Sequence, residues 1–121
     1  MEPLLRGIDI GIYTLPEILA EKLEQRDAPT GRHGAKRRAE GTWNMGRWPQ
    51  KLGKGTTPDR LFFACQGTWR GYFHIVPEVL FNPQDEDKPY SLIFDLTSWK
   101  EIDPTPAPRF RGFRYLTGMP T

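Results

Sequence analysis

Three short segments of this chain place aromatic rings beside glycines, arginines and amides. They are residues 41–48 (GTWNMGRW), 67–72 (GTWRGY) and 110–115 (FRGFRY). Flat rings stack on nucleobases, guanidinium groups bind phosphates, and side-chain amides hydrogen-bond the edges of bases. The three segments therefore indicate a nucleic-acid-binding site that needs no covalent chemistry and no cofactor.

Eight residues of these segments and their borders are the candidates for contact with nucleic acid. Trp43 and Trp69 are expected to stack on bases. The amides of Asn44 and Gln66 are expected to hydrogen-bond base edges, and the arginines to meet phosphates. The full set is Trp43, Asn44, Arg47, Trp48, Gln66, Trp69, Arg70 and Arg111. A tryptophan is also a large apolar side chain for the core of a small domain, and this structural role is favoured for Trp48 and Trp99.

Nucleophilic and metal catalysis have little support in the sequence. Cys65 lies inside an apolar strand pattern, where a cysteine is usually a small packed hydrophobe. His33 and His74 have no spacing that ties them to Cys65 or to a carboxylate. One cysteine and two histidines leave little for a metal site, and the sequence contains no Gly-rich phosphate loop. We therefore favour a binding protein without metal or cofactor over an enzyme.

Length and composition limit the class of protein. A chain of 121 residues predicts a single domain over 1–121. Its 12 glycines and 12 prolines imply short elements and many turns, which argues against a helical bundle. No apolar run approaches the roughly 18 residues of a membrane span, and no signal peptide is visible. We expect a soluble cytoplasmic protein with no membrane partner, and favour a monomer.

The net charge of +2 conceals an uneven distribution of charge. Residues 26–60 carry nine basic and three acidic side chains, and residues 109–121 carry three basic and no acidic ones. The segments 1–25 and 61–108 are acidic. Two basic blocks on an acidic body favour a localised site for an anionic partner, although solvated loops give the same pattern.

The first third of the chain has the pattern of a strand and a helix followed by a loop. Apolar residues alternate over 8–12 and predict a half-buried strand. Thr14 and Glu17 form a capping box for a helix over 15–26. The apolar face of this helix is expected to consist of Leu15, Ile18, Leu19 and Leu23. Residues 29–41 have almost nothing to bury, and we expect a mobile basic loop there.

The second half of the chain has the pattern of a β-sheet. The predicted strands are 60–66, 70–76, 91–96 and 111–116. The first two are expected to form a hairpin with its turn at 67–69. An exposed acidic loop over 83–89 and a proline-rich extended connector over 103–108 separate the others. These elements predict an α+β fold, a small and strongly bent or barrel-like β-sheet with one or two flanking helices.

Over residues 40–116 the sequence resembles the PUA-like superfamily, with its YTH, EVE and ASCH branches. The resemblance is carried by residues 41–43 (GTW), 61–66 (LFFACQ) and 69–73 (WRGYF), in that order. In the YTH and EVE branches a tryptophan near the start of the domain is followed by a similar strand, a tight turn and a second strand. The resemblance implies a PUA-like fold with an aromatic pocket that holds a single base, modified or unmodified, of RNA or DNA.

The resemblance also implies roles for individual residues. Trp43 would be the first wall of the aromatic pocket, and Asn44 a polar reader beside it. Gln66 would stand where the family often has an asparagine at the end of the strand. Trp99 and the segment that begins at Arg111 are similar to the C-terminal part of the superfamily.

Two alternatives from other functional classes stay open. The ASCH branch includes amidohydrolases that act on acetylated cytidine with a Lys, Thr and Glu set, for which Thr42 and Glu78 are loose candidates here. A hydrolase of this type predicts turnover of a modified nucleoside. A protein–protein interaction module would use the aromatic residues as interface anchors and would have no affinity for nucleic acid.

Overall fold

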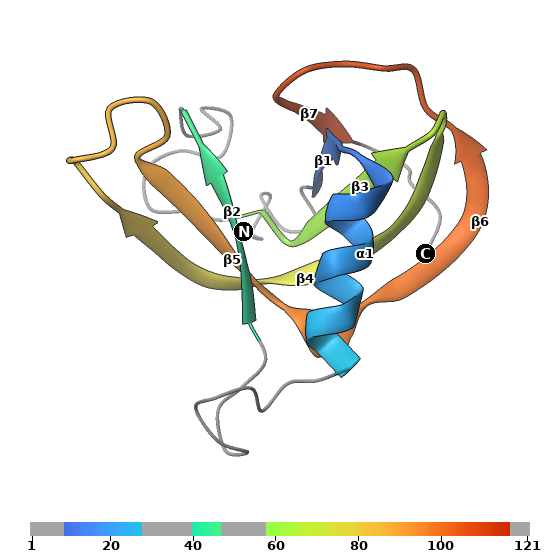
Figure 1. The fold of residues 1–121 in the computed structure, drawn as a ribbon, viewed down its shortest axis with the longest axis horizontal. Coiled ribbons are helices and arrows are strands. Elements are labelled where there is room, and N and C mark those ends of the chain that lie inside the picture. The colour runs from blue at the N-terminus through green and yellow to red at the C-terminus, as the bar shows by residue number, and fades with distance from the viewer. Residues whose placement is uncertain (1–8, 28–39, 47–57, 117–121) are drawn as a thin grey trace, which may run out of the picture.

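The structure is a computed structural model that describes residues 9–27, 40–46 and 58–116. Within these ranges the elements are β1 (Asp9–Tyr13), α1 (Pro16–Asp27), β2 (Glu40–Met45), β3 (Arg60–Cys65), β4 (Thr68–Phe81), β5 (Tyr90–Asp95), the 3-10 helix η3 (Leu96–Ser98), β6 (Lys100–Pro106) and β7 (Phe113–Leu116). Figure 1 shows α1 lying across a strongly curled sheet. The part described is thus a small α+β fold with a bent sheet, as the sequence predicts.

The long strand β4 organises this sheet. The strand order is β2-β5-β4-β3-β1-β7, and β6 also pairs with β4. The first residues of β4 lie between β3 and β6, whereas its last residues pair with β5. The register shifts between Ile75 and Val79, where β4 changes partners. Irregularities of this kind bend a strand, and here the sheet curls into a half-barrel (Figure 1).

The two faces of the sheet bury separate clusters of side chains. Successive side chains of a strand point to opposite faces. In β3, Leu61 and Phe63 point to the face that contacts Leu19 of α1. Phe62 and Ala64 point to the other face. We call these two surfaces the helix-side face and the opposite face.

The helix-side face is covered by α1 through a narrow apolar contact. Leu19 is buried and Leu23 packs half-buried against the same cluster. Leu15 was expected on this contact, but it is 60% exposed because it precedes the first turn of α1. The ammonium of Lys22 donates to the carbonyl of Thr42 at 3.3 Å and links α1 to β2. Among the described residues, no helix has the length and apolarity needed to cross a membrane.

The predicted hairpin of β3 and β4 is present, with a tighter turn than the sequence suggests. Cys65 pairs with Thr68, which leaves Gln66 and Gly67 as a two-residue turn. Both residues have positive φ, 51° and 83°. Two successive positive φ values are characteristic of a type I′ turn, whose twist matches that of the flanking strands. The turn therefore precedes the predicted position, and Thr68 and Trp69 belong to β4.

The backbone of Gln66 leads to a prediction for stability. A left-handed conformation costs a side chain with a Cβ roughly 1–2 kcal/mol, and glycine avoids that cost. We expect Gln66→Gly to raise the free energy of unfolding by up to about 1 kcal/mol, since the greater freedom of glycine in the unfolded chain offsets part of the gain. Urea unfolding measures this change. The matched control is Gln84→Gly at an exposed turn position without positive φ, where no gain is expected.

Two strands lie where the sequence predicts irregular structure. Residues 100–106 form β6, although the sequence predicts a connector over 103–108. Pro104 and Pro106 are tolerated because, within the described residues, β6 pairs only with β4 and is an edge strand. Residues 40–45 form β2 in place of a polar turn-rich segment. Gly41 allows this strand to approach β5 closely, since a Cβ at Gly41 would lie 2.7 Å from the ring of Phe94.

The two predicted loops have different outcomes. Residues 82–88 between β4 and β5 are all exposed, which confirms the acidic loop. Residues 28–39, most of the predicted mobile loop, lie outside the described residues.

Candidate functional site

The chain that joins β6 to β7, together with the start of β7, carries the largest group of exposed arginines among the described residues. It passes over the sheet from β6 to β7 (Figure 1). The amide of Ala107 donates to the carbonyl of Gly67 at 2.9 Å and fixes the start of this segment to the hairpin turn. Gly112 has a φ of 71°, which turns the chain into β7. Arg109, Arg111 and Arg114 are exposed along this path.

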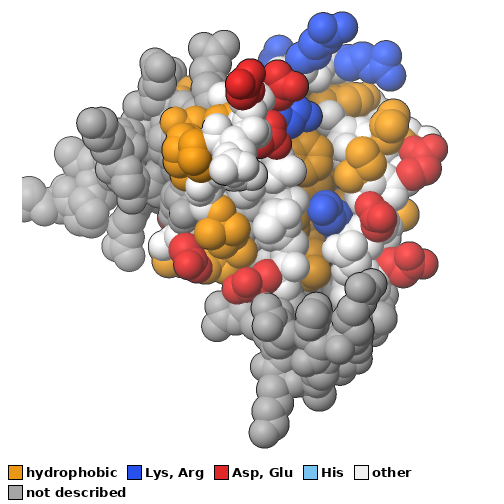
Figure 2. All heavy atoms as spheres, turned by 60° about the vertical axis from the view of Figure 1, so that its left-hand side comes forward, with side chains coloured by type: hydrophobic (Ala, Val, Ile, Leu, Met, Phe, Trp, Pro, Cys, Tyr) orange, Lys and Arg blue, Asp and Glu red, His pale blue; other side chains and the backbone are white. Residues whose placement is uncertain are grey.

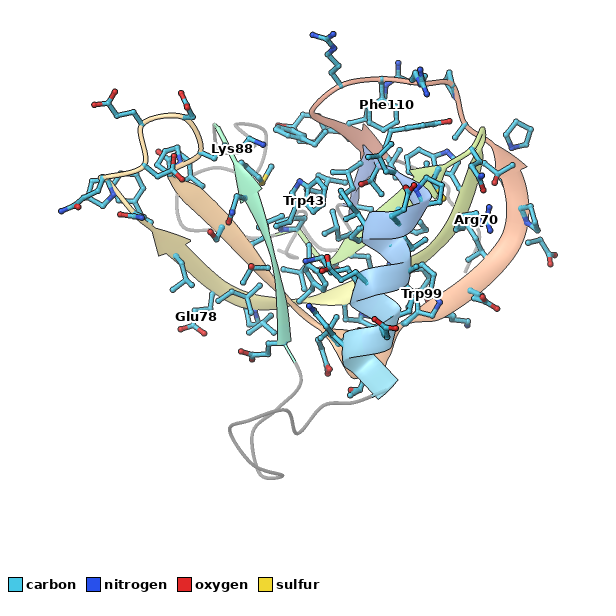
Figure 3. The ribbon with its side chains drawn as sticks, viewed as in Figure 1. Trp43, Arg70, Glu78, Lys88, Trp99 and Phe110 are labelled. Carbon is cyan, nitrogen blue, oxygen red and sulfur yellow. The ribbon has the colours of Figure 1, made fainter. Side chains whose placement is uncertain are left out.

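A set of aromatic rings on the opposite face supports this segment. Phe110 is half-buried, and the centre of its ring lies 5.8 Å from that of Tyr13, edge to face, and 5.9 Å from that of Trp69. Trp69 in turn lies over Gly11, where a Cβ would come within 2.7 Å of the indole. Figure 3 shows Phe110 beneath the chain that joins β6 to β7. The rings therefore connect β1, β4 and this chain segment into one surface.

The guanidinium groups of two arginines lie over these rings. The Cζ atom of Arg114 is 4.7 Å from the centre of Phe110, and that of Arg109 is 6.0 Å from the centre of Tyr13. Within the described residues, neither arginine nor Arg111 has a carboxylate within ion-pair distance. We call Tyr13, Arg109, Phe110, Arg111 and Arg114 the arginine–aromatic surface. It combines positive charge with accessible ring edges.

The hairpin turn lies beside this surface. The amide of Gly67 donates to the hydroxyl of Tyr13 at 2.6 Å. Gln66 is exposed at the tip of the turn, directly before Gly67, and so lies near the Tyr13 end of the surface. Of the residues selected from the sequence, Gln66, Trp69 and Arg111 are thus brought together. Trp69 supports the surface from below, because only 6% of it is exposed and its ring is not open to a base.

Trp43 lies elsewhere, on the helix-side face. It is half-buried, and the centre of its ring lies 5.9 Å from that of Phe63 in an edge-to-face arrangement. Because Trp69 lies on the opposite face, the two tryptophans do not line a common pocket. Asn44 follows Trp43 in β2 and points away from it. Its side-chain oxygen accepts a hydrogen bond of 2.6 Å from the Ser91 hydroxyl. The expected pairing of a tryptophan wall with a neighbouring amide reader therefore does not form.

The remaining candidates are separate from the surface. Arg47 and Trp48 lie outside the described residues. Arg70 is exposed in β4, and Figure 3 shows it apart from Phe110, where β4 and β6 run side by side. Trp99 packs against Phe63 and Phe73 in the helix-side core. This position in the core agrees with a structural role for Trp99.

The described residues hold few groups suited to catalysis. Cys65 is buried in the helix-side core, and His74 is exposed on β4. Thr42 and Glu78, the loose candidates for a hydrolase, are both exposed. In the described ranges no three His, Cys, Asp or Glu side chains are placed to hold a metal ion. Among these residues the arginine–aromatic surface is the site with the clearest chemistry.

Comparisons with protein-family models, curated proteins and solved structures gave no match. The function must therefore be inferred from the chemistry of the arginine–aromatic surface itself. Four of its members, Tyr13, Arg109, Phe110 and Arg114, were not among the candidates selected from the sequence. Arg114 could have been found there, because residues 110–115 alternate rings with cations. Tyr13 could not, because it is far from this segment in the chain.

An ion pair between Asp9 and Arg60 lies on the opposite face of the sheet, next to Phe62 and Tyr72. Asp9 is buried, and its two carboxylate oxygens accept hydrogen bonds of 2.9 Å and 2.7 Å from Nε and Nη2 of Arg60. The guanidinium of Arg60 also lies 5.3 Å from the ring of Phe62 and 5.0 Å from that of Tyr72. The hydrogen bond to Asp9 raises the pKa of Arg60. This pair fixes β1 to β3 and keeps the platform for Tyr13 in place.

Proposed function

We propose that this protein binds single-stranded nucleic acid through the arginine–aromatic surface. The observation that carries the proposal is the guanidinium of Arg114 over the half-buried ring of Phe110. A guanidinium held over a ring keeps its N–H groups available at its edge, and phosphates bind there in a forked geometry. Arg109 over Tyr13 repeats the arrangement. The planes of these guanidinium groups can themselves stack on unpaired bases.

The other elements favour a single strand over a duplex. Proteins that read duplex DNA commonly place a helix in the major groove. The exposed side of α1 carries Glu17, Glu21 and Glu24, whose charges repel phosphates. The arginine–aromatic surface is built instead from a loop and strand ends. Single-stranded ligands combine phosphate contacts with stacking on such surfaces.

A finer form of the proposal adds a PUA-like fold and a base pocket at Trp43. The bent sheet with α1 across it supports this form, as does the position of Trp43 half-buried beside Phe63. The pocket would lie on the helix-side face, and Gln66 and Arg111 would contact the flanking chain on the opposite face. RNA, DNA and a free modified nucleoside are all ligands of the required chemistry.

The test is a titration of fluorescently labelled single-stranded RNA and DNA, followed by anisotropy at several salt concentrations. The wild type is compared with the triple variant Arg109→Gln/Arg111→Gln/Arg114→Gln. Each phosphate contact on a single strand contributes about 0.7 to the slope of log affinity against log salt, so we expect the triple variant to lose about 2 from that slope. Its affinity at low salt should fall by at least about tenfold, which corresponds to about 1.4 kcal/mol.

The matched control removes three positive charges from other elements, in the variant Lys22→Gln/Lys88→Gln/Lys100→Gln. If this variant loses as much affinity as the arginine variant, binding depends on net charge and the proposed surface is wrong. If the wild type binds no oligonucleotide at low salt, nucleic-acid binding is wrong altogether. Trp43→Ala tests the base pocket separately. Unchanged binding of modified and unmodified oligonucleotides by Trp43→Ala would overturn the pocket and leave the arginine–aromatic surface standing.

A further inference from the structure

The end of the β4–β5 hairpin exposes large apolar side chains. Leu80 is 49% exposed and Phe81 is 57% exposed. They are neighbours in β4, so they lie on opposite sides of the hairpin. The ring of Phe81 packs 5.1 Å from that of Tyr90, which is half-buried. We call residues 78–91 the hairpin end. Burial of Phe81 by a partner would remove its apolar surface from water and favour association.

Carboxylates surround these apolar side chains in a loop that is already ordered. Asn82 accepts a hydrogen bond from the amide of Gln84 at 3.1 Å, and Asp85 accepts from the amides of Asp87 and Lys88 at 3.2 Å and 3.0 Å. Glu86 is exposed beside them. A fixed loop loses little conformational freedom when a partner binds. The hairpin end therefore presents an arranged acidic surface.

The charge of the hairpin end restricts what can cover it. It carries Glu78, Asp85, Glu86 and Asp87 against the single cation Lys88. Phosphates of a nucleic acid would be repelled, and so would the hairpin end of another copy placed against it symmetrically. Complementary surfaces pair a positive patch with a negative one. The partner must therefore bring cations together with apolar side chains.

This chain carries a surface of that chemistry, the arginine–aromatic surface. Arg109, Arg111 and Arg114 supply the cations, and Phe110 supplies a ring. Figure 2 shows acidic and hydrophobic side chains next to one another near the top of this face, with a group of basic side chains beside them at the upper right. The two surfaces are formed by different segments of the chain. The hairpin end of one molecule can therefore contact the arginine–aromatic surface of another.

We infer that the hairpin end is a docking site for the arginine–aromatic surface of a second copy of this chain. The contact joins two different surfaces, so it is head-to-tail and can continue from one copy to the next. It is held by charge pairs at an exposed interface, and salt therefore weakens it. It does not depend on nucleic-acid binding, although a nucleic acid on the arginines would compete with it.

The experiment is analytical ultracentrifugation of the full chain without nucleic acid, at low and high salt. At low salt the average mass of the wild type should rise above 14.0 kDa with increasing protein concentration, and high salt should return it to the monomer. The acidic-end variant Phe81→Ser/Glu86→Gln/Asp87→Asn and the basic-end variant Arg111→Gln/Arg114→Gln should each remain monomeric. A one-to-one mixture of the two should form dimers and nothing larger, because each variant keeps one intact surface.

The matched control is Leu15→Ser, which removes an apolar side chain of similar exposure on another element, and which should associate as the wild type does. Circular dichroism and urea unfolding check that each variant is folded. A wild type that stays monomeric at every concentration would overturn the inference. So would a mixture of the two variants that does not associate. Loss of association in the acidic-end variant alone would indicate a symmetric contact between hairpin ends and would also overturn it.

Discussion

Replacing Arg60 with methionine should lower the free energy of unfolding by about 3–5 kcal/mol, because it leaves a buried carboxylate without its partner. Asp9 is 2% exposed, and among the described residues Arg60 supplies the two hydrogen bonds to its carboxylate. The carboxylate cannot move into water without separating β1 from β3, since Asp9 and Arg60 are paired in that ladder. Urea unfolding followed by circular dichroism measures the loss.

Two further variants separate the buried charge from the loss of a long side chain. Arg70→Met removes an exposed arginine from β4 and should change the free energy of unfolding by less than about 0.5 kcal/mol. The double variant Asp9→Leu/Arg60→Met replaces both charges with apolar groups and should recover much of the stability, as buried pairs often do. If Arg60→Met were no more destabilising than Arg70→Met, the ion pair would have no structural importance.

Phe63→Ala is expected to have an effect of similar size, about 3–5 kcal/mol. Phe63 is fully buried on the helix-side face. Its ring contacts four others at centre distances of 5.5–6.4 Å, those of Trp43, Phe73, Phe94 and Trp99. These rings come from four different segments, so the cavity left by alanine cannot close by the movement of one element. Tryptophan fluorescence should also change, because Trp43 and Trp99 lose a neighbour.

The chain offers a control of the same residue type. Phe81 is 57% exposed at the hairpin end, and Phe81→Ala should alter the free energy of unfolding by only about 0.5 kcal/mol. If the two variants unfold in urea with equal m values, the difference between their midpoints gives the difference in their free energies of unfolding. Equal losses at the two positions would mean that Phe63 does not hold the helix-side core together.

Most strands could be predicted because their local pattern agrees with their burial. Residues 61–65 are an apolar run in a strand that is buried on both faces, and such runs are recognisable without tertiary information. The turn after them was misplaced because glycine was taken as its start, whereas Gln66 also adopts positive φ. β6 and β2 were missed for another reason. The prolines of β6 are tolerated because this strand lies at an edge of the sheet. The glycine of β2 is explained by the close approach of this strand to the ring of Phe94.

The candidate site was predicted in part. The alternation of rings and arginines at 110–115 identified a segment that does lie exposed on the surface. Trp43 and Trp69 were both predicted to stack on bases in one site, and each follows Gly-Thr in the sequence. In the structure they lie on opposite faces of the sheet. Neither contact of Phe110 with Tyr13 and Trp69 could be read from the chain, because both join the segment between β6 and β7 to strands that are distant in the sequence.

The sequence by itself determined the class of fold, the hairpin, the acidic loop and the arginine-rich segment near the C-terminus. These follow from local alternation, turn residues and charge, which act over a few neighbouring positions. The tertiary structure alone decided which side chains share a face. The curl of β4 and the parallel pairing of β1 with β3 bring Tyr13 beneath Arg109 and bury Trp69 under Phe110. A shift of one residue along a strand reverses the face of a side chain, so the composition of a surface depends on registers that only the folded sheet specifies.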